Sequence, residues 1–218
     1  MTKASDVSRK PWWPLLRPDL IPFKVFQSAA PPDAAFFLWK HETMTELRTE
    51  RLNMRPYAEA DFDAMARLHG TPKVMVGLRE GALSRDEARA YFDSYARDWR
   101  TLGRGIFALY GRTDGTYIGE CGFWVREGFD GSALRYILDA PYWGAGFALE
   151  AAEAALDWGF ETQGVPVVNA VSRVDNPASE RILQKLGMVL SDTAHKGQAG
   201  LHRYTVTRAQ WLAARPGP

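Results

Sequence analysis

The stretch Leu138-Asp139-Ala140-Pro141-Tyr142-Trp143-Gly144-Ala145-Gly146-Phe147-Ala148 decides the fold of this chain. An apolar strand, expected at Leu134 to Leu138, passes through a glycine turn straight into a helix expected at Phe147 to Phe160, which has small residues on one face. A helix N-terminus leaves backbone N–H groups free, and glycine and alanine leave them uncovered. The turn therefore predicts a cradle for a diphosphate. Close packing of the helix on a sheet is an equally open reading of the same glycines.

Two familiar phosphate-binding motifs do not fit this turn. A P-loop requires Gly-Lys-Ser/Thr at its end, whereas Ala148 is followed by Leu149-Glu150. A dinucleotide fingerprint requires a third glycine where Leu149 stands, together with a series of parallel strands. Nucleoside triphosphate hydrolysis and a nicotinamide cofactor are both disfavoured.

The sequence on either side of the turn alternates between strand and helix signals. Glycine, proline and a capping box at Ser84 and Glu87 punctuate the elements. We expect strands at Arg48–Arg55, Ile106–Tyr110, Tyr117–Val125, Leu134–Leu138, Val165–Val174, Met188–Ser191 and Leu201–Val206, and helices at Glu59–Leu68, Ser84–Leu102, Phe147–Phe160 and from Asn176-Pro177 to Gly187. This order predicts an α/β (α+β) fold: a mixed, mostly antiparallel sheet of about six to seven strands with one parallel β-α-β step, flanked by helices.

Composition limits the partners. The chain has 218 residues with 27 Lys+Arg against 26 Asp+Glu, a net charge of +1, so neither nucleic acid nor an acidic membrane is the default partner. The single cysteine, Cys121, excludes an intrachain disulfide and predicts a cytoplasmic protein. No apolar run approaches the roughly 18–20 residues of a membrane span. The four histidines are scattered without the spacing of metal ligands, so we expect no metal.

The chain divides into an N-terminal extension at 1–46, a core domain at 47–207 and a C-terminal tail at 208–218. Six of the 13 prolines precede Met44, amid tryptophans and phenylalanines. Charged residues interrupt every candidate secretory signal there. The extension is either a poorly structured segment over the core, with Met44 as an alternative start, or a Trp-rich arm that docks on a partner or second subunit.

Four stretches in order resemble one family. They are Thr49-Glu50-Arg51-Leu52-Asn53-Met54-Arg55-Pro56, Leu134 to Glu150, Asn176-Pro177-Ala178-Ser179 and Gln184-Lys185-Leu186-Gly187-Met188. Together they resemble the GNAT superfamily of acyl-CoA N-acyltransferases, in its ribosomal-protein N-terminal acetyltransferase-like branch, from Leu47 to about Thr207.

This resemblance implies acetyl-CoA as cosubstrate and assigns its contacts. The family's turn, Gln/Arg-x-x-Gly-x-Gly/Ala, maps onto Trp143, Gly144, Ala145, Gly146, Phe147 and Ala148, whose amides would hold the pyrophosphate. The strand residues Tyr136, Ile137 and Leu138 would pair with the pantetheine arm and leave an amide near the thioester carbonyl. Asn176 would bond the same arm. On its own, Asn176 reads as a helix cap.

The chemistry requires a neutral amine, because an alkylammonium has a pKa near ~10.4. The resemblance implies Ser179 as the acid near the thiolate, since Leu183 stands where many members carry tyrosine. Ala133 and Arg135 replace the usual glutamate and glycine, which leaves Glu120 as the candidate base. A carboxylate paired with Arg135 on the next strand is the alternative role for Glu120.

We therefore expect an N-acetyltransferase that moves an acetyl group from acetyl-CoA to a primary amine by direct attack in a ternary complex. Cys121 has no basic neighbour in sequence to lower its pKa, so an acyl-cysteine route is disfavoured. The acceptor-side loops would be Thr71 to Leu83 and His195 to Gly200. The alternative is an acyl-CoA-binding module with a decayed catalytic set. A homodimer is a further expectation.

Overall fold

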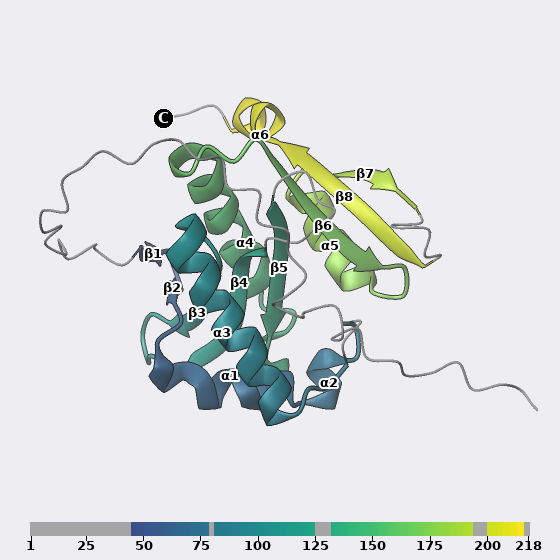
Figure 1. The fold of residues 1–218 in the computed structure, drawn as a ribbon. Coiled ribbons are helices and arrows are strands. Elements are labelled where there is room, and N and C mark those ends of the chain that lie inside the picture. The colour runs from purple at the N-terminus through teal and green to yellow at the C-terminus, as the bar shows by residue number, and fades with distance from the viewer. Residues whose placement is uncertain (1–44, 79–80, 125–131, 194–199, 216–218) are drawn as a thin grey trace, which may run out of the picture. The chain divides into compact units, whose positions relative to one another are not determined.

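One eight-stranded sheet runs through the protein in the order β1-β2-β3-β4-β5-β6-β8-β7 (Figure 1). The computed structural model describes residues 45–78, 81–124, 132–193 and 200–215, all within one compact unit, Thr43–Pro218. The expected mixed and mostly antiparallel sheet is confirmed, with one strand more than the upper expectation. The strands are β1 (Leu47–Arg48), β2 (Leu52–Pro56), β3 (Ile106–Gly111), β4 (Tyr117–Trp124), β5 (Ser132–Leu138), β6 (Val167–Arg173), β7 (Val189–Asp192) and β8 (Leu201–Thr207).

The helices begin and end close to their sequence signals. Ser84 caps α3 through a bond from the backbone N–H of Glu87, and Gly103 ends the same helix in the left-handed conformation. Asn176 caps α5, with Pro177 at its first position. The helical elements are η2 (Glu59–Asp61), α1 (Phe62–His69), α2 (Pro72–Met75), α3 (Arg85–Leu102), η3 (Ala140–Tyr142), α4 (Phe147–Asp157), the π-helical turn η4 (Trp158–Thr162), α5 (Pro177–Lys185) and α6 (Arg208–Ala214).

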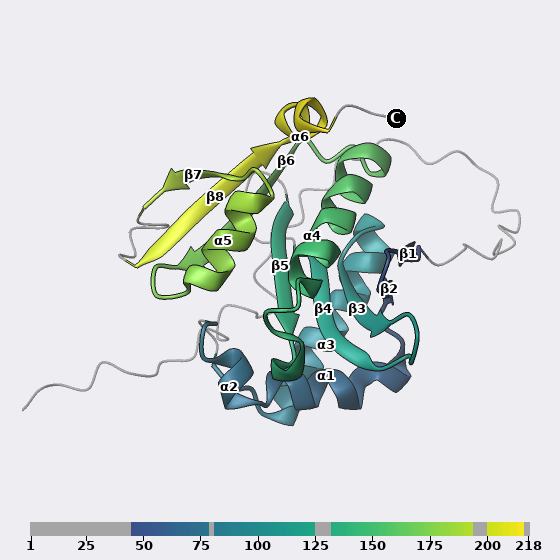
Figure 2. The same cartoon turned by 180° about the vertical axis from the view of Figure 1, so that it is seen from behind.

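Helices cover both faces of the sheet. α1 and α3 lie on one face, and α4 and α5 lie on the other, as the two opposite views show (Figures 1 and 2). Ala152 and Ala155 of α4 are fully buried in the core, Ala148 is half-buried, and at Gly159 in η4 a Cβ would collide with the ring of Phe123. The small side chains on this face therefore allow the helix to pack close to the sheet.

The parallel step lies between β5 and β6, and it is short. Only Ser132 and Ala133 pair with this neighbour, opposite Val168 and Asn169, although β5 continues to Leu138. The two strands separate toward their C-terminal ends (Figure 2). The far half of β5 thus keeps an edge that β6 does not pair.

Three elements differ from expectation. The single strand expected at Arg48–Arg55 is a two-stranded hairpin, because the chain turns at Thr49–Arg51 and pairs Leu47 with Met54. The loop expected at Thr71 to Leu83 contains α2. Residues 208–214, expected as tail, form α6. The expectations for His195 and for most of its loop fall outside the described residues.

Candidate active site

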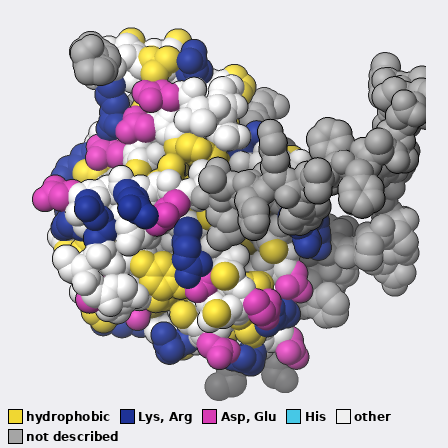
Figure 3. Space-filling model, turned by 90° about the vertical axis from the view of Figure 1, so that its left-hand side faces the viewer, with side chains coloured by type: hydrophobic (Ala, Val, Ile, Leu, Met, Phe, Trp, Pro, Cys, Tyr) yellow, Lys and Arg dark blue, Asp and Glu magenta, His cyan; other side chains and the backbone are white. Residues whose placement is uncertain are grey.

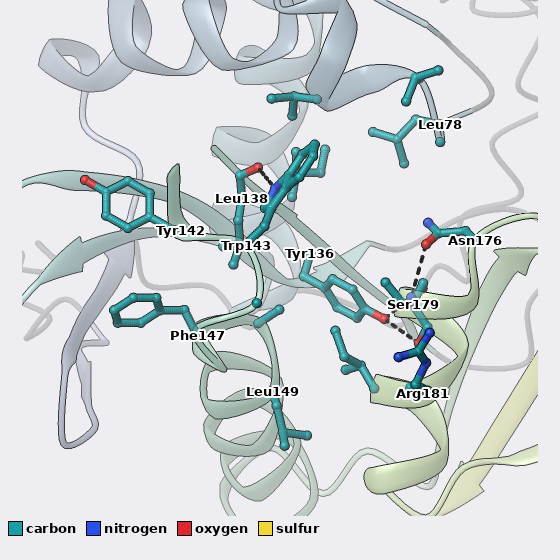
Figure 4. A pocket seen from close by; sticks show the side chains of 18 of the residues that line it. Leu78, Tyr136, Leu138, Tyr142, Trp143, Phe147, Leu149, Asn176, Ser179 and Arg181 are labelled. Atoms are coloured by element: carbon teal, nitrogen blue, oxygen red, sulfur yellow. Dashed lines mark hydrogen bonds between the residues drawn. The ribbon is translucent and has the colours of Figure 1, made fainter. Parts of the chain in front are cut away.

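A cavity of about 680 Å³ opens where the glycine turn, the end of β5 and the start of α5 meet. The strand contributes Tyr136, Ile137 and Leu138 to its wall, and α5 contributes Asn176 and Ser179. Figure 4 shows Tyr136 between Trp143 and Phe147 of the turn region on one side and Asn176 and Ser179 of α5 on the other. The expected cofactor residues that line the cavity are Tyr136, Ile137, Leu138, Trp143, Gly144, Gly146, Phe147, Ala148 and Asn176. The structure therefore brings the continuous strand-and-turn segment at 136–148 together with the start of α5, which follows it by about 30 residues in the sequence.

The glycine turn has the backbone that its sequence requires. Gly144 has φ +75° and Gly146 has φ +87°, both in the left-handed region that glycine adopts without strain. Gly146 is the residue before α4, so the first free N–H groups of an 11-residue helix lie beside the cavity. Ala145 is not among the lining residues, and its carbonyl accepts a hydrogen bond from Arg51 Nη1 at 2.8 Å.

Backbone alternation sets which edge of β5 faces the cavity. The Asp139 N–H donates to the Ile118 carbonyl on β4 at 2.9 Å, so the neighbouring N–H of Leu138 points to the opposite edge, toward β6. The Leu138 carbonyl on that edge accepts from Trp143 Nε1 at 2.8 Å (Figure 4). Trp143 thereby fastens the start of the turn to the end of the strand. Sequence reasoning placed Trp143 in the turn but did not anticipate this bond.

Ser179 and Tyr136 form a hydroxyl pair at the cavity wall. The Tyr136 hydroxyl lies 2.9 Å from Ser179 Oγ, and the Ser179 N–H donates to Asn176 Oδ1 at 3.1 Å (Figure 4). Burial raises the pKa of Tyr136 above its ordinary value, although its bond to Ser179 opposes the shift. A phenol that stays protonated is a hydrogen-bond donor at neutral pH. Leu183, at the position of the family's tyrosine, is buried in the core.

Glu120 lies at a different place, buried under the α1 and α3 face. Its side chain is 0% exposed, and it is not among the residues that line the cavity. One carboxylate oxygen accepts from Tyr95 at 3.0 Å, and the other accepts from Tyr57 at 2.9 Å and lies 3.1 Å from His69 Nε2. Its cross-strand neighbour Ile137 does line the cavity, so the carboxylate is one residue away from the wall.

The charge of Glu120 is compensated inside the protein. Burial alone would raise the pKa of this carboxyl, but the electrostatic interactions with the nearby His69 and Arg135 and the bond from Tyr57 outweigh it and hold the pKa below its ordinary value. The guanidinium of Arg135 is 3.7 Å away, which is the pairing that the sequence offered as the alternative role. Glu120 is thus a carboxylate at neutral pH and a member of a buried polar network.

The remaining nucleophile and metal candidates lie outside this chemistry. Cys121 is fully buried, and burial together with the nearby charge of Glu120 raises the pKa of its thiol. Within residues 45–78, 81–124, 132–193 and 200–215, no group of three or more His, Cys, Asp or Glu side chains could hold a metal ion. No described helix is long and apolar enough to cross a bilayer.

Comparison with known proteins now identifies the family. Residues 51–189 match the model of the acetyltransferase (GNAT) domain. YkkB, an uncharacterized protein of Bacillus subtilis, is 27% identical over 155 residues, which are 70% of this chain and 90% of the relative. The uncharacterized N-acetyltransferase YnaD of the same species is 25% identical over 65% of this chain and 81% of its own length.

Solved structures agree with the sequence matches. An acetyltransferase from Agrobacterium tumefaciens superposes with a TM-score of 0.68 at 28% identity, over 75% of this chain and 95% of that one. A ribosomal L7/L12 alpha-N-protein acetyltransferase in complex with coenzyme A superposes with a TM-score of 0.65 at 16% identity, over 75% and 98%. At that identity the second likeness concerns the fold alone. The chain belongs to the GNAT family of acetyltransferases.

Proposed function

We propose that the cavity binds acetyl-CoA and that the chain transfers the acetyl group to a primary amine by direct attack in a ternary complex. One observation carries this proposal. The same cavity is lined by a glycine turn at a helix N-terminus, by the edge of β5 that β6 leaves uncovered beyond Ala133 and by the Asn176–Ser179 cap of α5. These three features suit the diphosphate, the pantetheine amides and the sulfur of one extended cosubstrate.

The diphosphate end is the best supported. The backbone N–H groups of Gly144, Gly146, Phe147 and Ala148 lie beside the cavity, where the α4 dipole favours negative charge. Basic side chains line the same cavity: Lys73, Arg173, Arg181 and Lys185. Arg173 is already paired with Asp175, so the others supply most of the uncompensated positive charge for phosphate groups. Ala145 is part of the turn but does not line the cavity, so its own contact with the diphosphate stays a prediction.

The pantetheine arm would extend along β5. Tyr136 and Leu138 offer their backbone groups on the edge that faces away from β4, and Ile137 adds an apolar wall. The Leu138 N–H is then the donor for the thioester oxygen, where negative charge develops during attack. Asn176, as the cap of α5, would bond the arm with its remaining amide hydrogens.

Ser179 is the proposed hydrogen-bond donor to the departing thiolate, with Tyr136 as its partner. A hydroxyl that already bonds a second hydroxyl can rotate its proton toward the sulfur while it accepts from the phenol. We expect that Ser179→Ala and Tyr136→Phe each lower kcat by about tenfold, with a smaller change in the KM for acetyl-CoA. A loss confined to KM in both variants would contradict this assignment and leave the pair as part of the binding wall.

For Glu120 the geometry favours a positioning role. A base must come within hydrogen-bond reach of the amine or of one water, and this carboxylate has neither exposed surface nor a place in the described cavity wall. We propose that Glu120 fixes β4 against α1 and α3 through His69, Tyr57 and Tyr95. The direct role as a base stays a prediction, which the pH profile of Glu120→Gln decides.

The acceptor and the setting of the reaction are proposals at a coarser level. A protein N-terminus and a small-molecule amine both fit a primary-amine acceptor, and a cytoplasmic location and a homodimer remain expectations. No nucleic acid is needed as a partner, because the net charge is +1 and acidic and basic side chains are interspersed on the face shown in Figure 3.

The test of the reaction is thiol release from acetyl-CoA with a panel of peptides, polyamines and amino-sugar amines. We expect acceptor-dependent release of CoA and an acetylated product of matching mass. Tight CoA binding without turnover on any acceptor would instead support the alternative, an acyl-CoA-binding module with a decayed catalytic set. That alternative is motivated by Ala133, Arg135 and Leu183, which replace the residues usual in the family.

A further inference from the structure

The turn between β1 and β2 is bonded to the first turn of α4, about a hundred residues away. Thr49 Oγ1 and the backbone N–H of Arg51 both donate to Glu150 Oε1, at 2.5 and 2.9 Å. Arg51 Nε donates to Glu150 Oε2 at 2.7 Å, and its Nη2 lies 2.6 Å from the same oxygen. Both carboxylate oxygens are therefore used: Oε2 meets two guanidinium nitrogens, and Oε1 accepts from the Thr49 hydroxyl and the Arg51 backbone. These charge-assisted contacts hold the guanidinium in place.

The same guanidinium also reaches the glycine turn. Arg51 Nη1 donates to the Ala145 carbonyl at 2.8 Å, and the guanidinium lies 4.3 Å from the ring centroid of Phe147. A trans peptide places its C=O and N–H on opposite sides. Arg51 bonds the Ala145 carbonyl from the side of the turn away from the cavity. The N–H of Gly146, which belongs to the same peptide, then points toward the cavity.

Two details agree with that orientation. Gly146 lines the cavity, whereas Ala145, Arg51 and Glu150 do not. A Cβ on Gly146 would lie 3.3 Å from Arg51 Nη2, so the missing side chain leaves the guanidinium its place behind the turn. The bond from Arg51 and the absence of a Cβ at Gly146 thus favour the same orientation of the peptide between Ala145 and Gly146.

Charge gives the pair a second use. Glu150 is in the first turn of α4, near the expected diphosphate, where an uncompensated carboxylate would repel an anion. Its side chain is only 17% exposed, so water screens it weakly. Arg51 compensates this charge and leaves the helix N-terminus attractive to phosphate.

We propose that Arg51, oriented by Glu150, is a positioning residue for acetyl-CoA: it fixes the peptide between Ala145 and Gly146 so that the Gly146 N–H addresses the diphosphate. The inference rests on the proposed function, which places the diphosphate at this turn. Arg51 acts from outside the cavity and touches no part of the cosubstrate in this arrangement. Arg51 therefore affects only the affinity that the diphosphate contributes to binding of the cosubstrate.

The test compares two ligands on the full chain. CoA carries the diphosphate, whereas pantetheine has the same thiol arm without the diphosphate. Dissociation constants are measured by calorimetry, and that of the weaker ligand is measured by competition. We expect Arg51→Met to weaken CoA by about tenfold and pantetheine by no more than about twofold. Arg51→Lys keeps the charge but not the separate nitrogens that contact Glu150 and the Ala145 carbonyl together, and we expect about a threefold loss for CoA.

Arg112→Met is the matched control. Arg112 Nη1 donates to the Thr49 carbonyl at 2.7 Å, so this variant loosens the same turn from its other side without touching Ala145 or Glu150. We expect it to bind CoA within about twofold of the wild type. Melting temperatures of both variants report any general loosening of the β1–β2 hairpin.

The outcomes distinguish a wrong role for Arg51 from a wrong diphosphate site. A wild type that binds pantetheine as tightly as CoA would place no diphosphate at this turn, and the proposed site would be wrong. A wild type that prefers CoA, with the preference unchanged in Arg51→Met, would leave the site standing and overturn the role of Arg51. Equal losses for both ligands, or equal losses in Arg51→Met and Arg112→Met, would overturn it too.

Discussion

At the scale of single residues, Glu120 shows how a side chain that looks catalytic in sequence can have another use. A charged residue in the alternating strand Ile118 to Trp124 needed a reason, and a base was one candidate. The structure surrounds the carboxylate with two tyrosine hydroxyls, His69 and Arg135. The pairing with Arg135 was one of the two roles that the sequence offered. His69 and the two tyrosines lie on other segments, so no sequence spacing could reveal them as partners.

A stability measurement on Glu120→Gln follows from this network. Loss of one member of a buried charge pair typically costs about 3–5 kcal/mol, so we expect the free energy of unfolding at pH 7 to fall by about that amount. The folded-state pKa of Glu120 is lowered, so its contribution is present above the ordinary value of 4.5 and is lost as the pH falls below it. Urea unfolding of both proteins between about pH 3 and 7 should show their stabilities converging toward the acid end.

The activity of Glu120→Gln tests whether Glu120 is also the general base. If Glu120 acts only through position, the pH profile of kcat/KM in Glu120→Gln keeps its shape while the stability falls. A profile that loses its acidic limb, with stability near that of the wild type, would restore Glu120 as the base. Tyr95→Phe, which removes one hydroxyl from the same carboxylate, is the milder structural control.

At the scale of elements, α6 is the clearest addition that the structure makes to the sequence. Trp211 is 3% exposed, its ring centroid lies 5.8 Å from that of Phe160, and its Nε1 donates to Asp157 at 2.8 Å. Thr207 and Gln210 form a capping box at the start of the helix. The segment therefore closes the core beside η4.

We expect Trp211→Ala to lower the free energy of unfolding by about 3–5 kcal/mol, because a large buried aromatic is lost and its cavity is not refilled. Arg215→Ala is the control. Arg215 lies over the same ring and pairs with Glu153 and Asp157, but those charges are more than a third exposed, so the expected loss is below about 1 kcal/mol. Equal losses in the two variants, measured by urea unfolding, would mean that α6 is held by its surface pairs instead.

Elements with local signals could be predicted, and elements made by distant contacts could not. The capping box at Ser84 and the Asn-Pro start of α5 are encoded within a few residues, and both helices begin where expected. The β1–β2 turn depends on Glu150, 101 residues from Thr49, so the local alternation suggested one continuous strand. The same distance explains why Arg51 and Glu150 were missed: an acidic residue in a first helical turn usually serves the dipole alone.

At the scale of the whole molecule, the candidate site depends on the separation of β5 and β6. The glycine turn and the α5 cap were both visible in the sequence, but their convergence on one cavity requires that the parallel pairing stop after Ala133. Sequence patterns predicted the parallel step and gave no signal for its length. The proposed diphosphate cradle would draw on backbone amides, which add nothing to the net charge of +1.

The last prediction concerns the extent of the chain that this fold requires. The compact unit of the structure spans Thr43–Pro218, and its described elements run from Leu47 to Ala214. We therefore expect a chain that starts at Met44 to keep the fold and to bind CoA as the full chain does. Because the urea m-value scales with the surface exposed on unfolding, the two chains should agree in midpoint and, within about 10–15%, in m.

The contrary result has a definite meaning, because the sequence left the role of residues 1–43 open. If those residues pack on the core, the shortened chain exposes less new surface on unfolding, and both m and the midpoint fall together. If they form an arm between subunits, m for the folded unit stays, while sedimentation shows a smaller particle and the midpoint becomes independent of protein concentration. Agreement in m, midpoint and particle size would exclude both roles and confine the function to the unit that carries the cavity.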